Sequence, residues 1–174
     1  TGQPPGWAPF LPVQDPDLDF YPGPHDYWWR GHYVPNTISA IANEGKDWSF
    51  AKAEDIKRGL ELHYILLERH LMGKSFDPGN YEPWITPFVE SKFWDTWQPV
   101  AVEYRMIDRR YMIAGTADLI MQNKKNGVVA IADLKTLSEK GKKRDIRKQL
   151  GGYMVLLWQQ FPELQLPMCY GLWS

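Results

Sequence analysis

The sequence predicts an α/β domain in which a small mixed β-sheet is flanked by helices. Two observations predict this class: apolar residues recur at helical spacing before Pro99, and short segments with the alternation typical of strands follow it, separated by turns. A further helix and a short strand complete the chain. The length of 174 residues suits one domain. Lys and Arg (20) nearly balance Asp and Glu (21), so the net charge does not indicate nucleic-acid binding.

Residues 1–37 contain eight of the fourteen prolines and many aromatic residues. They predict an extended arm that packs on a domain formed by residues 38–174. Helices are expected from Thr37, over Ser49–Met72 and from about Thr86 to Trp97. One stripe of the second helix is expected to pack against the sheet, and it contains Ile56, Leu60, His63, Leu67 and Leu71.

Strands are expected in the second half of the chain, where apolar and β-branched residues alternate with polar ones. Asn126 and Gly127 are typical of a hairpin turn between two of them. The predicted order is three antiparallel strands, a helix and a closing strand, over Val100–Ile107, Tyr111–Met121, Val128–Leu134, about Lys143–Gln160 and Met168–Trp173.

Two aspartates and a lysine stand at unusual places in these strands. Asp118 lies within an apolar strand, where an ionised carboxylate is costly unless it is paired or metal-bound. Asp133 ends the next apolar strand, and Lys135 shares its face because side chains alternate along a strand. Hairpin pairing across the Asn126-Gly127 turn would bring Asp118 roughly opposite Asp133.

Such a cluster could hold a metal ion. Two carboxylates offer the oxygen ligands that Mg²⁺ or Mn²⁺ prefers, and the metal would activate water for attack on a phosphodiester. The lysine could orient the water or stabilise developing charge. The competing interpretation is a buried Asp–Lys ion pair beside an unrelated aspartate at a strand end.

The arrangement of Asp118, Asp133 and Lys135 resembles the PD-(D/E)xK nuclease superfamily, and within it the RecB-type nucleases of recombination, CRISPR and phage systems. The resemblance covers roughly residues 32–173 and implies a restriction-endonuclease-like core. It implies catalytic roles for Asp118, Asp133, Lys135, Gln149 and Tyr153, and a metal site formed by His63, Asp118, Asp133 and Leu134. Gln149 and Tyr153 lie four apart on one helical face; otherwise they are a solvated Gln and a core Tyr.

The family often carries Gly-x-x-x-His on its first long helix, matched here by Gly59 and His63. A Glu commonly follows the His by four residues, but Leu67 stands at that place and Glu68 comes one later. Glu103 lies on a strand where relatives often carry an acidic residue, and we expect it to support the site. Without the resemblance, His63 reads as a core histidine.

A basic segment follows the site lysine: Lys140, Lys142, Lys143, Arg144, Arg147 and Lys148. We expect it to contact backbone phosphates, although such a run is otherwise a solvated face. Aromatic residues could stack on unpaired bases or pack as ordinary core, in particular Tyr27, Trp28, Trp29, Tyr81 and Trp84.

The expected function is a deoxyribonuclease that uses Mg²⁺ or Mn²⁺ and acts on DNA ends or single strands, as an exonuclease. The alternatives are a catalytically inactive nucleic-acid-binding module and a structure-specific endonuclease on branched DNA or RNA. Recombination or repair proteins are candidate partners, and a cytoplasmic location is expected. The single Cys169 excludes a cysteine-ligated iron–sulfur cluster, and no apolar run could span a membrane.

Overall fold

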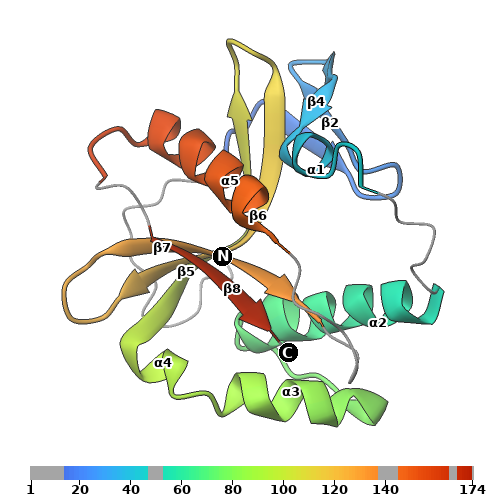
Figure 1. Ribbon diagram of the computed structural model, residues 1–174, viewed down its shortest axis with the longest axis vertical. Coiled ribbons are helices and arrows are strands. Elements are labelled where there is room, and N and C mark those ends of the chain that lie inside the picture. The colour runs from blue at the N-terminus through green and yellow to red at the C-terminus, as the bar shows by residue number, and fades with distance from the viewer. Residues whose placement is uncertain (1–13, 47–52, 137–144, 165–167, 174) are drawn as a thin grey trace.

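The computed structural model describes residues 14–46, 53–136, 145–164 and 168–173. A mixed five-stranded sheet lies between two helical layers (Figure 1). Its strands are β4 (Asn36–Thr37), β5 (Trp97–Asp108), β6 (Ile113–Asn123), β7 (Val129–Lys135) and β8 (Met168–Trp173). This is the restriction-endonuclease-like α/β architecture that the sequence predicted, and β8 has the predicted bounds.

Strand β6 is the centre of the sheet. Strand β5 pairs with it antiparallel along one edge, from Trp97↔Asn123 to Asp108↔Ile113. On its other edge, β4 pairs in parallel with its first residues and β7 pairs antiparallel with its later ones. Strand β8 then adds to β7 in parallel. The pairing of β6 with β7 stops at Leu119↔Ala132, so the two strands separate just where the sequence reaches Asp118 and Asp133.

One face of the sheet is covered by α5 (Arg147–Gln160) and α1 (Ile38–Ala42). Two glycines allow close approach on this face. A Cβ at Gly115 of β6 would lie 2.9 Å from the ring of Tyr153, and one at Gly152 would lie 2.7 Å from Ile38. Both positions therefore demand glycine on steric grounds, and they bring Tyr153 against the central strand.

The opposite face is covered by α2 (Ala53–His63), η1 (Tyr64–His70), α3 (Glu82–Val89) and α4 (Phe93–Thr96), with η2 (Gly79–Tyr81) leading into α3. The single helix expected over Ser49–Met72 changes to π-helix after His63, with backbone bonds from Leu71 to Leu66 and from Lys74 to Arg69. The helix expected from Thr86 to Trp97 is two short helices, since α3 ends at Val89 and α4 begins at Phe93. Trp97, the expected last residue of that helix, already belongs to β5.

The stripe predicted on the second helix is wrong in its first half. Leu67 and Leu71 are buried as expected, but Ile56 is 53% exposed and Leu60 is 69% exposed. The stripe assumed one straight α-helix packed along its whole length. Only the part from Leu62 onward contacts the core, where the buried side chains are Leu62, Ile65, Leu66, Leu67 and Leu71.

Regular structure appears where the sequence predicted an extended arm. Residues 18–34 form a separate three-stranded antiparallel sheet of β1 (Leu18–Tyr21), β2 (Asp26–Trp29) and β3 (His32–Val34). Its inner face buries Leu18, Tyr27 and Val34 against Ala114 of β6. The prolines concealed these short strands, since they lie in or beside the turns. None of the described helices is long and apolar enough to cross a bilayer.

Candidate metal centre

The candidate centre lies at the fork between β6 and β7. The last pair of these strands is Leu119↔Ala132, and the same register continued by one residue sets Asp118 opposite Asp133, as the hairpin count predicted. The strands have separated there, and the Asp118 carboxylate fills the gap: Oδ2 accepts a 2.7 Å hydrogen bond from the backbone N–H of Leu134. Asp118 is 9% exposed and Asp133 is fully buried.

Asp133 carries the least satisfied carboxylate of the described residues. Its Oδ2 lies 2.6 Å from Nζ of Lys135, but neither oxygen has a well-oriented hydrogen bond. Burial, and then the charge of Asp118, raise the pKa of Asp133 to about 6, although Lys135 opposes the shift. Each oxygen of an ionised carboxylate has two acceptor sites, so a carboxylate with one cationic contact can still accept a further cation or donor.

His63 reaches the fork from the last residue of α2. Its Nε2 lies 2.8 Å from the carbonyl oxygen of Leu134 and 3.8 Å from Oδ2 of Asp118. The predicted metal ligands His63, Asp118 and Leu134 therefore do converge. The first of these distances suits a hydrogen bond, and it also suits two adjacent ligands of one octahedral cation, which lie about 3 Å apart for bonds of about 2.1 Å.

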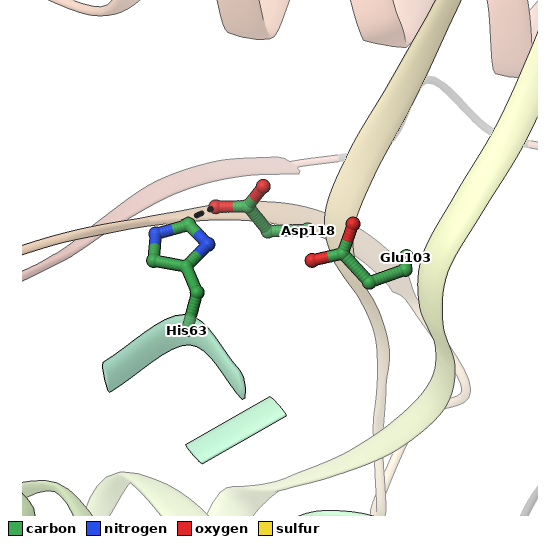
Figure 2. Close-up of side chains that lie close together, drawn as sticks. All are labelled: His63, Glu103 and Asp118. Atoms are coloured by element: carbon green, nitrogen blue, oxygen red, sulfur yellow. Dashed lines mark ion pairs between the residues drawn. The ribbon is translucent and has the colours of Figure 1, made fainter. Parts of the chain in front are cut away.

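Glu103 joins the same cluster from β5 (Figure 2). One ligand atom from each of His63, Glu103 and Asp118 lies within 4.8 Å of the other two. The pairs Val102↔Leu119 and Tyr104↔Ala117 flank Glu103, so it lies opposite Asp118 across the strands. Burial, followed by the charges of Asp118 and Glu68, raises its pKa to about 8. The sequence predicts only a supporting role for Glu103, and its one signal is an acidic residue inside a predicted strand.

The donor types fit a hard divalent cation. His63, Glu103 and Asp118 bring one imidazole nitrogen and two carboxylates close together, and the Leu134 carbonyl oxygen lies beside His63. The buried Asp133 carboxylate adds a third negative charge, which Lys135 contacts. Oxygen ligands with one nitrogen suit Mg²⁺ or Mn²⁺. The pKa values of Asp133 and Glu103 are raised first by burial and then by the charge of Asp118, although Lys135 and Arg105 act in the opposite direction.

Gln149 and Tyr153 approach from α5, on the other face of the sheet. Nε2 of Gln149 donates a 2.9 Å hydrogen bond to the Tyr153 hydroxyl, and Ser39 of α1 lies 3.5 Å from that hydroxyl. Burial raises the pKa of Tyr153, and the charges of Asp118 and Asp133 act in the same direction. The hydroxyl therefore stays protonated, and Gln149 on its own helix holds it in place.

The residues predicted to contact nucleic acid do not all take the expected places. Lys140, Lys142, Lys143 and Arg144 lie outside the described residues. Arg147 and Lys148 begin α5, but the Arg147 guanidinium is paired with Asp145 at 2.7 Å. Tyr27 cannot stack on a base, because it is 1% exposed and its hydroxyl bonds to Thr116. Trp28, at 36% exposed, faces outward beside Tyr33, and their ring centroids lie 5.6 Å apart.

Glu68 does not occupy the position expected one α-helical turn after His63. Leu67, at the spacing common in the family, is fully buried, and Glu68 is exposed on the π-helical segment. Its charge still raises the pKa of Glu103. The sequence alone left the role of Glu68 open because the wider π-turn has no clear sequence signal.

A comparison with protein-family models gives a match. The family model described as the PD-(D/E)XK nuclease superfamily matches residues 56–170, which include His63, Glu103, Asp118, Asp133, Lys135, Gln149 and Tyr153. A comparison with curated proteins finds no significant match.

Proposed function

The chain belongs to the PD-(D/E)XK nuclease superfamily, and from that premise we propose that it is a metal-dependent deoxyribonuclease that acts on DNA ends or single strands. The observation that carries the proposal is Asp133. Its carboxylate is fully buried, lies against Lys135 and has open acceptor sites beside Asp118. Burying ionised carboxylates is costly unless they are paired or metal-bound, and Lys135 alone does not balance the charges of Asp133, Asp118 and Glu103, so a bound cation would offset that cost.

His63, Glu103, Asp118, Asp133 and the Leu134 carbonyl would hold the cation. A divalent ion bound there would polarise the scissile phosphodiester and lower the pKa of the attacking water. We assign the carboxylates of both aspartates as ligands and treat Glu103 as a third acidic ligand. The imidazole of His63 adds the nitrogen donor.

Lys135 is the proposed catalytic cation. Its side chain is about one third exposed and its ammonium group contacts Asp133. It can therefore contact Asp133, a proposed ligand of the cation, and also a substrate that approaches from solvent. In this position it would orient the attacking water and stabilise charge on the phosphate oxygens. Tyr153 stays protonated and accepts from Gln149, so its own hydrogen can be donated toward the site.

The preference for single strands or ends draws support from exposed aromatic rings rather than from charge. Trp28 and Tyr33 form an outward-facing pair on the small sheet, and Tyr21 is 52% exposed on the same sheet. Aromatic faces stack on unpaired bases, whereas a duplex keeps its bases stacked on one another. Arg147 and Lys148 at the start of α5 would contact backbone phosphates without reading sequence.

The test uses end-labelled linear single strands, linear duplexes, covalently closed circles of both forms and single-stranded RNA. Each is incubated with the protein and Mg²⁺, Mn²⁺ or EDTA, and Asp133→Asn serves as the control for contaminating nucleases. We expect metal-dependent degradation of linear single-stranded DNA and resistance of the closed circles. Cleavage of closed circles would overturn the exonuclease part, and preferred cleavage of RNA would overturn the DNA part. Absence of metal-dependent cleavage of every substrate would overturn the proposal.

A further inference from the structure

The backbone of Glu103 has an unusual conformation for a residue inside a strand. Its φ is +49°, in the left-handed region that side chains other than glycine rarely adopt. The neighbouring pairs Val102↔Leu119 and Tyr104↔Ala117 keep one register on both sides of Glu103, and the register of the strand shifts only earlier, between Pro99 and Ala101. Such strain persists only where the surrounding structure holds it.

Gln14 provides a contact that can hold it. Its side-chain Nε2 donates a 3.1 Å hydrogen bond to the backbone carbonyl of Glu103, in a partly buried position. The next residue fixes this segment on the domain: the Asp15 carboxylate pairs with Arg109 at 2.6 Å and its own carbonyl accepts from Leu18. The amide of Gln14 is thus anchored on the strand that carries Glu103.

We propose that Gln14 is a positioning residue for the metal centre. Its side-chain amide holds the peptide of Glu103 in the left-handed conformation, and this conformation keeps the Glu103 carboxylate close to His63 and Asp118. The inference rests on the proposed metal-binding function. It goes beyond the family match, because residue 14 lies well before the matched residues 56–170.

The physical reason is the competition between two backbone states. Released from Gln14, Glu103 would relax toward the extended conformation of its neighbours, which all L residues favour in a strand. The direction of its Cα–Cβ bond would change, and the carboxylate would leave the cluster. Groups that orient metal ligands commonly change metal affinity 10–100-fold when they are removed.

The experiment measures Mn²⁺ affinity of the whole protein by isothermal titration calorimetry. Gln14→Leu and Gln14→Glu both remove the donor while keeping a side chain of similar length. We expect each to bind Mn²⁺ about 10-fold or more weakly. The melting temperature of the metal-free variants should stay near that of the wild type. Gln98→Leu is the matched control, since Gln98 lies on the same strand but bonds to Gln122.

A second comparison asks whether Gln14 acts through Glu103. Glu103→Gly tolerates the positive φ and lacks the carboxylate, so adding Gln14→Leu to it should cause no further loss of Mn²⁺ binding. Mn²⁺ binding that is too weak for calorimetry in the Glu103→Gly background is measured instead from the rise in melting temperature at high Mn²⁺ concentration.

Three outcomes would overturn the role of Gln14: unchanged Mn²⁺ affinity in its variants, an equal loss in Gln98→Leu, or a further loss in the Glu103→Gly background. A wild-type protein that binds no Mn²⁺ would instead overturn the metal centre itself. The two failures are therefore distinguishable.

Discussion

Nε2 of His63 and the carbonyl oxygen of Leu134 lie 2.8 Å apart, although 71 positions separate the two residues in the sequence. The contact joins the end of α2 to the end of β7 and closes the fork between β6 and β7. Leu134 also donates its backbone N–H to Asp118, so one residue links the histidine and the aspartate of the proposed centre.

Removing the histidine should reduce metal binding and alter metal choice. His63→Ala loses the only nitrogen donor of the described cluster, and imidazole suits Mn²⁺ better than Mg²⁺. We expect wild-type activity to be higher with Mn²⁺ than with Mg²⁺ at equal concentration, and the variant to show a smaller preference. Titration of both metals against both proteins checks this. A metal-bound structure with the imidazole still bonded to Leu134 and distant from the ion would make His63 structural.

Asp133→Asn should abolish cleavage without unfolding the protein. The substitution keeps the shape of the side chain and removes a buried charge whose pKa is raised to about 6 by burial and by Asp118. Ionisation of a group whose pKa is raised on folding destabilises the folded state, so at neutral pH the metal-free variant should melt at the same temperature as the wild type or higher. Nuclease assays and thermal melts test the two parts. The exposed Asp95→Asn is the control and should retain activity; cleavage at wild-type rate by Asp133→Asn would contradict the assignment.

Lys135→Ala should slow the chemical step on the order of 10²-fold if its ammonium group stabilises developing charge. The variant also deprives Asp133 of its only cationic contact among the described residues. Single-turnover rates at saturating metal separate the loss of chemistry from the loss of metal affinity. Lys57→Ala, an exposed lysine of α2, is the control. A wild-type rate for Lys135→Ala would limit this lysine to a structural ion pair.

The stability of the metal-free protein should fall as pH rises because of Glu103 and Asp133. Their pKa values are raised by burial, to about 8 and about 6, whereas in the unfolded chain both groups titrate near 4. Between these values the folded state binds more protons than the unfolded state, so the free energy of unfolding decreases with pH.

Urea denaturation from pH 5 to pH 9 measures this dependence. Relative to Glu103→Gln, the wild type should lose stability on the order of a few kcal/mol across the range. A saturating divalent cation should remove the difference, since it stabilises the ionised carboxylates. Parallel curves for the two metal-free proteins would show that Glu103 ionises normally.

Charge reversal at Lys142, Lys143 and Arg147 should weaken DNA binding about equally for all sequences and reduce its salt dependence. Arg147 already pairs with Asp145, so its share of the effect should be the smallest. Binding measured at several salt concentrations gives the slope. Reversal of Lys125, in the hairpin turn between β6 and β7, is the control. An unchanged salt dependence of DNA binding would show that the basic segment is an ordinary solvated surface.

Local patterns were sufficient to predict much of the sheet and the positions of the central residues. Alternation and the Asn126-Gly127 turn indicated β6 and β7 and their approximate register, and the register brought Asp118 opposite Asp133. Strand alternation and the hairpin turn are both patterns among residues close together in the sequence, so they can be recognised without knowing the fold. The small sheet of residues 18–34 was not predicted, because its strands are only three or four residues long.

Ile56 and Leu60 show the limit of a helical pattern. The stripe correctly indicated one amphipathic helix, but the depth to which that helix packs is decided by α3 and the sheet, and those two residues remain exposed. The change to π-helix after His63 similarly depends on packing of the following turns in the core.

By itself the sequence determined which residues could perform the chemistry: Asp118, Asp133 and Lys135 follow from strand alternation and one hairpin, since these are contacts of short range. The family resemblance pointed to His63 and Glu103 as well, but only the tertiary structure decided how they and Gln14 reach the site. Glu103 enters the cluster through a strained backbone, His63 through the docking of α2 at the end of β7, and Gln14 through a contact across 89 positions. Side chains that meet only after distant segments pack leave no periodic pattern in the sequence, and the packing of the whole chain therefore sets their positions.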